Sequence, residues 1–343
     1  MEYLMEINYK LKFYITILIF FIMFFCSSMA FSARPQYLIK FATVAPDGSA
    51  WMKRMRTLDD KLRKDSGNRL GFAFYPGGVA GDEIDVLKKM RISQIHCAAF
   101  SGVGFGQILP MLRVLDLPFL FRNYKEIDAT QRQLKDFFSD QFKQKGFHLL
   151  AWAEVGNAHV FSRKPITSIK DFEGLKAWAW SGDPVARETF VHLGVSPIQL
   201  PITDVTTALS TGMIDTVYAP PIGALALQWH SSMSYMTEWP LAHATGAILI
   251  SSSSMEKLPT DLSQMLTRET GLAMEELTST LRNQSRDAID VIRKGGISLT
   301  PPPPDNETKT FSDVHRKVAA SLRDKLFPGE LLDRVYGILE GLR

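Results

Sequence analysis

The seven histidines are the side chains best suited to metal binding or proton transfer, and their spacing argues against both. None of them stands with a Cys, Asp or Glu at a spacing typical of a metal site. The chain also lacks a phosphate-binding Walker loop, an HExxH zinc motif and a GxSxG nucleophile motif. We therefore expect no metal, no cofactor and no catalytic residue, and a protein that binds its ligand without transforming it.

Two further motifs have structural explanations. Cys97 lies in a predicted strand, where the adjacent His96 points to the opposite face, so the thiol is expected to be a buried small hydrophobe. Residues 102–106 read GVGFG but lack the third glycine position of a dinucleotide-binding fingerprint. They favour a loop close to a ligand, or a closely packed helix, over a cofactor site.

The composition is that of a globular protein. Its 343 residues, 45% of them hydrophobic, are enough for about two domains. A formal net charge of +3 leaves no strongly basic surface for nucleic acid. A mean hydropathy of -0.03 excludes a polytopic membrane protein.

Residues 1–30 are predicted to form a signal peptide. Two lysines precede the apolar run 13–25, and small residues flank Met29. The run is short for a hydrocarbon layer about 30 Å thick. We expect cleavage near Ala30 and export to the periplasm. An uncleaved anchor is the alternative, whereas the large residue before Cys26 argues against a lipoprotein.

The elements after the signal peptide alternate as in an α/β protein. An N-terminal unit, 31–124, has predicted strands over 37–44, 70–75 and 95–100, separated by helices over 49–66 and 82–91. This order is typical of a parallel sheet covered by helices.

A second α/β unit is predicted over 125–251. Its expected strands lie over 147–154, 158–161, 176–180, 196–200 and 214–219, and its helices over 124–145, 183–192 and 204–211. The remaining chain, 252–343, is expected to span both units with one long helix over 261–294 and two final helices over 306–326 and 328–342.

Four stretches of the chain, in order and at matching spacing, resemble the DctP-type solute-binding subunits of TRAP transporters. They read FATVAP at 41–46, LDLPFLF at 115–121, KPI with DFEGLK at 164–176, and LGVSP with ALSTGMID at 193–215. The resemblance implies a two-lobe, periplasmic-binding-protein-like α/β fold with central sheets, a cleft between the lobes and a long bracing helix. It also implies closure on a ligand and partnership with the membrane permease subunits, with an accessory periplasmic protein or lipoprotein as a further candidate partner.

The sequence departs from the family at the positions that hold ligand. The strand after Gly-Leu-Lys usually carries an arginine that clamps a carboxylate, and here Trp178 stands in its place. Ala158 replaces a second common arginine, and Ala219 replaces a common asparagine. Phe100 occupies a position that can be acidic, and Tyr218 does not match the metal-binding variant of the family.

These replacements predict an apolar or weakly polar ligand. A buried charge without its partner costs about 3–5 kcal/mol, whereas apolar contact contributes about 25 cal/mol per Å². Trp178 and Trp180 share one face of a predicted strand and are expected to line the pocket. The alternative is that both are core residues of a strand buried on its two faces. The candidate ligand-binding residues are Phe100, Asn157, Ala158, His159, Trp178, Trp180, Ile202, Tyr218 and Ala219.

Two other functions stay open at this point. The receptor could bind an organic acid through unfamiliar donors such as Asn157, His159 or Lys176, the last of which shares a face with the two tryptophans. A secreted hydrolase on a related scaffold, using His159 or His230, would need a nucleophile–base pair that the sequence does not display.

Overall fold

The computed structural model describes residues 34–302 and 305–343, so the predicted signal peptide lies outside the described residues. Within them, eight strands form one sheet in the order β10-β8-β4-β9-β3-β1-β2, with β7 paired to β4. Their bounds are β1 Tyr37–Ala42, β2 Leu70–Tyr75, β3 Cys97–Ser101, β4 Phe147–Ser162, β7 Thr216–Ala219, β8 Tyr235–Thr237, β9 Ala242–Ser251 and β10 Ser298–Thr300. The strands β5 (Trp178–Trp180) and β6 (Ile198–Leu200) pair separately and in parallel.

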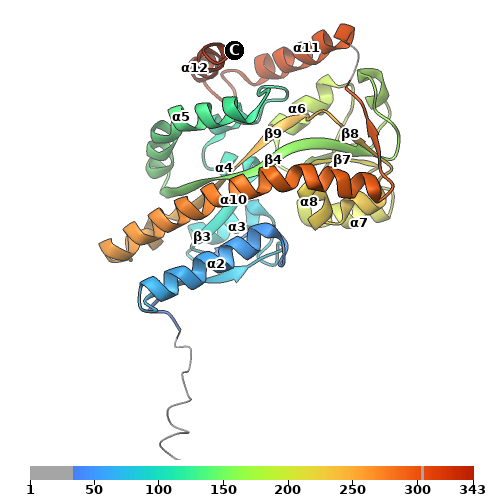
Figure 1. Ribbon diagram of the computed structural model, residues 1–343. Coiled ribbons are helices and arrows are strands. Elements are labelled where there is room, and N and C mark those ends of the chain that lie inside the picture. The colour runs from blue at the N-terminus through green and yellow to red at the C-terminus, as the bar shows by residue number, and fades with distance from the viewer. Residues whose placement is uncertain (1–33, 303–304) are drawn as a thin grey trace, which may run out of the picture.

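The long strand β4 connects two halves of the molecule (Figure 1). Its first part pairs antiparallel with β9, and its last residues pair with β7 and β8. The sequence pattern predicts two strands here, over 147–154 and 158–161, and this prediction is wrong. Gly156 and Asn157, which separate the two predicted strands, do not interrupt β4. The strand has a bulge between Glu154 and Gly156, where Gly156 has a φ of 115°, and its pairing with β9 continues on both sides of the bulge.

The first half consists of β1, β2 and β3 with the helices α2 (Ala50–Asp65), α3 (Glu83–Arg91) and α4 (Gly102–Gly106). The hydroxyl of Ser49 caps α2 by accepting from the Met52 amide at 3.2 Å. Asp82 caps α3. After α4 the chain makes a 3-10 turn, η1 (Pro110–Asp116), before the long α5 (Tyr124–Gln144).

The second half contains β5, β6, β7 and β8 with short helices. These are α6 (Pro184–His192), α7 (Val205–Ser210) and α8 (Pro221–Ala226), together with the 3-10 turns η2 (Ile169–Phe172), η3 (Ile202–Asp204) and η4 (Trp229–Ser232). Ser168 and Asp171 form a capping box at the start of η2. At α6, Asp183 is the cap and Pro184 follows as the first helical residue.

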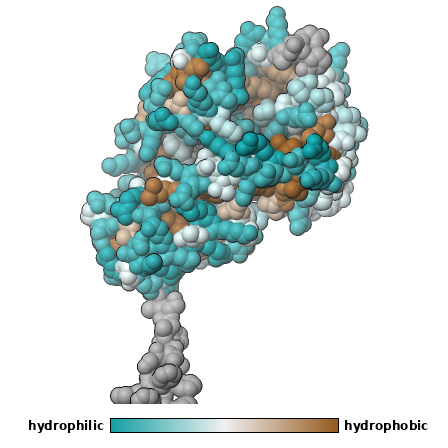
Figure 2. All heavy atoms as spheres, in the orientation of Figure 1, coloured by the Kyte–Doolittle hydropathy of each residue, from teal (hydrophilic) through white to brown (hydrophobic). Residues whose placement is uncertain are grey.

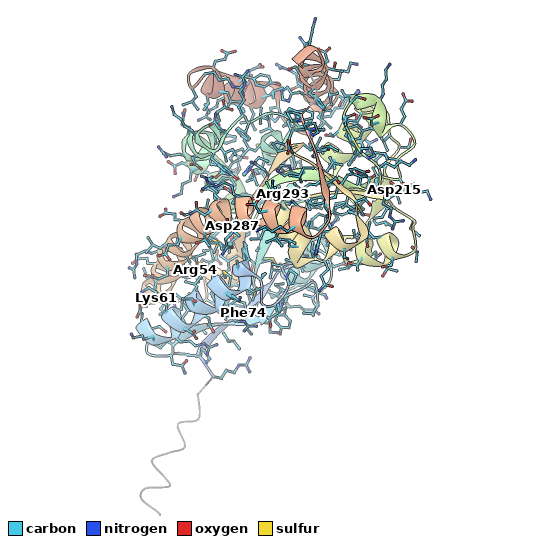
Figure 3. All side chains as sticks on the ribbon, turned by 45° about the vertical axis from the view of Figure 1, so that its right-hand side comes forward. Arg54, Lys61, Phe74, Asp215, Asp287 and Arg293 are labelled. Atoms are coloured by element: carbon cyan, nitrogen blue, oxygen red, sulfur yellow. The ribbon has the colours of Figure 1, made fainter. Side chains whose placement is uncertain are left out.

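The long helix α10 (Thr260–Lys294) packs on β4, on α2 of the first half and on α8 of the second half. Its buried residues recur at helical spacing from Leu262 to Ile292. Figure 3 shows Arg54 and Lys61 of α2 on the side of this helix, where they pair with Glu276 and Glu269. The short α9 (Ser252–Met255) precedes α10, and α11 (Asp305–Leu322) and α12 (Gly329–Glu340) cover the molecule beyond α5 and α6.

The expected α/β architecture with a long helix across both halves is confirmed. The antiparallel strand β9 was not predicted, because its run AILIS is buried almost without alternation and offers no period of two. It lies in 125–251 yet pairs with β3 of 31–124, and the proposed division of the chain into units remains a prediction. Figure 2 shows hydrophilic residues over most of one face, and no helix within the described ranges is long and apolar enough to cross a membrane.

Candidate functional site

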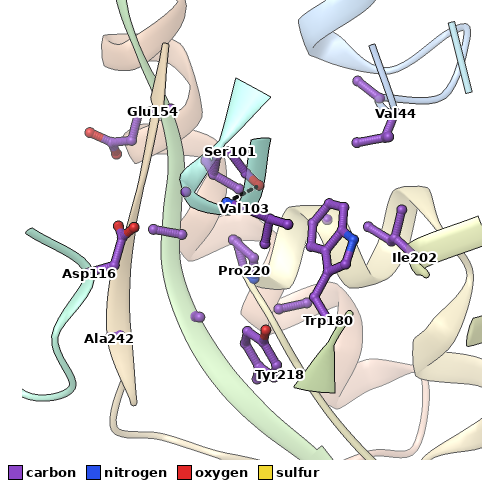
Figure 4. Close-up of a pocket in the computed structure, with 18 of the residues that line it drawn as sticks. Val44, Ser101, Val103, Asp116, Glu154, Trp180, Ile202, Tyr218, Pro220 and Ala242 are labelled. Carbon is purple, nitrogen blue, oxygen red and sulfur yellow. Dashed lines mark hydrogen bonds between the residues drawn. The ribbon is translucent and has the colours of Figure 1, made fainter. Parts of the chain in front are cut away.

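A cavity of about 260 Å³ lies between the two halves, with walls from both. The first half contributes the segment after β1, the start of α3 and the end of β3 with α4; the second half contributes β5, β7 and α8. The predicted site residues that line it are Phe100, Ala158, Trp178, Trp180, Ile202, Tyr218 and Ala219. Figure 4 shows Val44 and Val103 facing Trp180, Ile202 and Tyr218 across this space.

An aromatic cluster forms the wall on the second half. Trp178 stacks on Tyr218 with ring centroids 5.1 Å apart, meets Trp229 edge-on at 5.3 Å and lies 6.0 Å from Trp180. The Trp178 indole is 1% exposed and donates to the Leu200 carbonyl at 3.0 Å. Trp178 is therefore both a core residue and part of the cavity wall, because one side of the packed cluster faces the cavity.

Trp180 also connects the two halves of the molecule. Its indole N–H donates to the Asp82 carboxylate, at 2.9 Å to Oδ2. Asp82 caps α3 in the first half, and burial raises the pKa of its carboxyl despite this donor. One edge of the Trp180 ring thus lines the cavity while its polar atom is used in a bond between the halves.

Three of the predicted donors lie elsewhere. Asn157 accepts from the His243 ring at 3.0 Å, and His159 meets the Thr237 carbonyl at 2.8 Å; neither lines this cavity. Lys176 is exposed and donates to the Gly212 carbonyl at 3.2 Å, so it does not share the cavity-facing side of Trp178.

The structure brings to the cavity a charged cluster that sequence reasoning missed. Arg113 of η1 is 4% exposed and pairs through Nη2 with Asp183 Oδ1 at 2.7 Å and through Nε with Asp116 Oδ2 at 2.9 Å. Tyr218 donates its hydroxyl to Asp183 Oδ2 at 3.4 Å, which joins the cluster to the aromatic wall. The available signal was an arginine in the apolar run LRVLDL with an aspartate three residues later.

Burial dominates the electrostatics of this cluster. It raises the pKa of Asp116 to about 6, against the attraction of Arg113. Burial also opposes the charge of Arg113, but Asp183 and Asp116 outweigh it and leave the arginine pKa raised. Arg113 Nε, Arg113 Nη1 and Asp116 Oδ2 are buried without a hydrogen-bond partner among the described residues, so the pair of Arg113 with Asp116 is a contact of opposite charges rather than a hydrogen bond.

The GVGFG motif is a short helix, α4, that lines the cavity. Glu83 holds it by accepting from the Ser101 and Gly104 amides at 2.9 and 2.8 Å. Burial raises the Glu83 pKa to about 7. Figure 4 marks the bond from the Val103 amide to the Ser101 hydroxyl. Gly102 must be small, because a Cβ there would lie 2.1 Å from Asp116 Oδ2.

Further polar lining residues belong to β4 and β9. Glu154 pairs with Arg282 of α10 at 2.6 Å. His243 is buried and its pKa falls to about 3, so the ring is neutral at pH 7. No group of three or more His, Cys, Asp or Glu in the described part of the chain is arranged to hold a metal. The arrangement can enclose an apolar body, and its only described lysine or arginine lining residue is already paired.

Comparison with known proteins places the fold. Residues 41–324 match the family described as bacterial extracellular solute-binding protein, family 7 (DctP). The 2,3-diketo-L-gulonate-binding periplasmic protein YiaO of Escherichia coli is 23% identical over 76% of this chain and 78% of its own length. The sialic acid-binding periplasmic protein SiaP of Vibrio cholerae is 21% identical over 80% of this chain and 86% of its own.

Solved structures have the same fold at low sequence identity. The sugar acid binding protein DctPAm of Advenella mimigardefordensis, in complex with galactonate, has a TM-score of 0.82 at 21% identity, covering 90% of this chain and 97% of that one. A TRAP periplasmic solute binding protein of Ralstonia eutropha with bound (S)-2-acetolactate has a TM-score of 0.83 at 21% identity, covering 89% and 99%.

Proposed function

Because the chain belongs to the DctP family of TRAP transporter solute-binding proteins, we propose that it is a periplasmic receptor that captures an apolar or weakly polar small molecule in this cavity. The family consists of solute-binding receptors rather than enzymes, so the alternative of a secreted hydrolase does not hold. The proposed partners are the permease subunits of the transporter, to which the receptor would deliver its ligand.

The observation that carries the proposal is Trp178. At the position where the family resemblance implies a carboxylate-clamping arginine, this chain has an indole stacked on Tyr218 in the cavity wall. Ala158 and Ala219, at two more of the family's polar positions, also line the cavity. An aromatic wall with small neighbours favours apolar contact area, at about 25 cal/mol per Å² removed from water.

The charged lining residues support the same ligand class. Four carboxylates line the cavity, those of Glu83, Asp116, Glu154 and Asp183, and Arg113 is the sole Lys or Arg among the described lining residues. A ligand carboxylate would add negative charge to a buried site whose arginine is already neutralised. The ligands named for the relatives above are organic acids, and this chain is proposed to differ from them in ligand charge.

The first experiment identifies the ligand directly. Receptor purified from its native source, denatured and analysed by mass spectrometry, is expected to release a neutral, largely apolar molecule. An organic acid released in stoichiometric amount would contradict the proposed ligand class while leaving the receptor function intact.

Substitution of Trp178 then tests the wall. Trp178→Ala should weaken binding of that molecule on the order of a hundredfold, because a central aromatic contact is lost. It should also lower the free energy of unfolding by about 3–5 kcal/mol, because the indole is buried. Calorimetric titration and urea unfolding measure the two effects.

Phe161→Ala is the matched control. Phe161 belongs to the same buried cluster but does not line the cavity. Its loss should cost similar stability and leave binding nearly unchanged. If both variants lose binding equally, Trp178 acts only through folding and the proposed wall is wrong.

A further inference from the structure

We propose that Asp183, assisted by Asp116, masks Arg113, and that Asp183 is therefore the residue that makes this cavity reject organic anions. The inference rests on the proposed function in assuming that the ligand occupies this cavity. It assigns the selectivity against anions to one ion pair instead of to the missing family arginines alone.

The geometry supports a mask because Arg113 lies between two protein carboxylates, donating a hydrogen bond to Asp183 and forming an ion pair with Asp116. Arginine clamps a carboxylate through two N–H groups. Here Nη2 donates to Asp183 at 2.7 Å and Nε lies 2.9 Å from Asp116 Oδ2, so both edges of the guanidinium face a protein acid. Both carboxylates are buried with it, so the cluster of one arginine and two ionised carboxylates carries a net negative charge that opposes the entry of a third anion.

The masking residue Asp183 lies between the end of β5 and the start of α6. Asp183 Oδ1 also accepts from the Val185 and Ala186 amides, each at 3.0 Å, as the cap of α6. Since β5 ends at Trp180, the chain that places Trp178 in the wall also places Asp183 on Arg113. A ligand carboxylate would have to displace a side chain held by four donors.

Asp116 completes the mask from the other side. Its Oδ1 accepts from the Thr245 amide at 3.1 Å, and its Oδ2 lies against Gly102. Arg113 Nη1 remains without a described partner and is the donor that an unmasked site would offer together with Nη2. The structure therefore contains an arginine of the right kind for anions, in the cavity wall, held out of use.

Asp183→Asn is the decisive variant, because an asparagine keeps the Oδ1 acceptor for the α6 cap while it removes the charge and replaces Oδ2, the acceptor of the Tyr218 hydroxyl, with an amide NH2. The probes are hexanoate and its uncharged counterpart hexanamide, titrated calorimetrically at pH 7.5. Relative to the unaltered protein, Asp183→Asn should bind hexanoate on the order of tenfold to a hundredfold more tightly, the range of one charge-assisted hydrogen bond. Hexanamide affinity should change by less than about threefold.

The controls isolate Arg113 as the source of the gain. Asp183→Asn combined with Arg113→Gln should return hexanoate affinity to the unaltered level. Asp333→Asn removes the same charge from an exposed pair with Arg323 on the C-terminal helices and should gain nothing. If Asp183→Asn does not fold by circular dichroism, Asp116→Asn, which keeps the acceptor for Thr245, replaces it with the same expectation.

Three outcomes would overturn the mask: no hexanoate gain in a folded variant, a gain that survives Arg113→Gln, or hexanoate binding by the unaltered protein as tight as by the variant. These outcomes are independent of the co-purified ligand. An organic acid bound in the native protein by other donors would contradict the proposed ligand class, and the mask would still stand or fall on the Asp183 variants.

Discussion

Arg113 and Arg282 each pair with two carboxylates, at least one of which lines the cavity, yet their surroundings differ. The Arg113 side chain is 5% exposed, and both of its partners are buried. Arg282 is 18% exposed; it pairs with buried Glu154 and with Asp128, which is 43% exposed. It also lies 4.3 Å from the centre of the Tyr124 ring.

Burial, more than the number of partners, decides what each of these two ion-pair clusters does. Water can reach Asp128, so the Arg282 cluster can relax when one partner is removed. All three charged side chains of the Arg113 cluster are buried, so water cannot compensate for the loss of one of them, and each charge is stabilised by its partners in the cluster. We therefore assign Arg282 to bracing α10 against α5 and β4, and Arg113 to both stability and selectivity.

The largest expected effect comes from removing each arginine. Arg113→Met should lower the free energy of unfolding by about 3–5 kcal/mol, because it leaves two buried carboxylates without a counter-charge. Arg282→Met should cost less, about 1–2 kcal/mol, because Asp128 stays hydrated. Urea unfolding at pH 7.5 measures both. Equal losses would show that the difference in burial does not matter.

The second effect is a dependence of stability on pH that comes from Asp116 in the Arg113 cluster. The pKa of Asp116 is raised by burial from its ordinary value to about 6. The folded protein thus holds this proton more tightly than the unfolded chain does. Its contribution to stability is complete below about pH 4 and is lost as the pH rises through about 6, on the order of 2–3 kcal/mol.

Asp116→Asn should remove this dependence of the unfolding free energy on pH. The test is to measure the unfolding free energy of the variant and of the unaltered protein between pH 4 and 7 and to subtract one curve from the other. The subtraction is needed because His243 acts in the opposite direction. Its pKa is lowered to about 3, so its contribution is lost as the pH falls below about 6.5. Parallel curves for the two proteins would mean that Asp116 titrates normally.

The smallest expected effect concerns Asp82, a buried carboxylate whose bonds come from neutral donors. Trp180→Phe keeps the ring area and removes the N–H that donates to Asp82. We expect a loss of about 1–2 kcal/mol in unfolding free energy, typical of a hydrogen bond to a charged group. Trp178→Phe, which loses a bond to a neutral carbonyl, should cost less. A reversed order would indicate that the bond between the halves adds no stability.

The predictability of the fold depends on the element. Helix α10 was expected over 261–294 because its apolar residues recur at 3.6-residue spacing, and the structure has it at Thr260–Lys294. Strand β9 could not be found in the same way, since a strand buried on both faces has no alternation. The continuity of β4 through Gly156 depends on β9 as its partner, and so was equally hidden.

The predictability of the site follows the same division. The residues that line the cavity and were anticipated, such as Trp178, Ala158 and Ala219, stand in motifs whose order in the chain is informative. Asn157 and His159 were proposed as ligand-binding donors on either side of Ala158, but their side chains do not line the cavity and are bonded to His243 and Thr237. Neighbours along a strand alternate between its faces, so proximity in sequence does not place two side chains in one pocket.

What the sequence determined by itself was the α/β class, the long helix and the replacement of the family's arginine by Trp178, because periodicity and local motifs carry those facts. Only the tertiary structure decided which residues surround Arg113. Its partner Asp116 is three residues away along the chain, whereas Asp183 is 70 residues away and caps helix α6 in the other half. A charge's role depends on what surrounds it and how much water reaches it, and both are set by the folded chain.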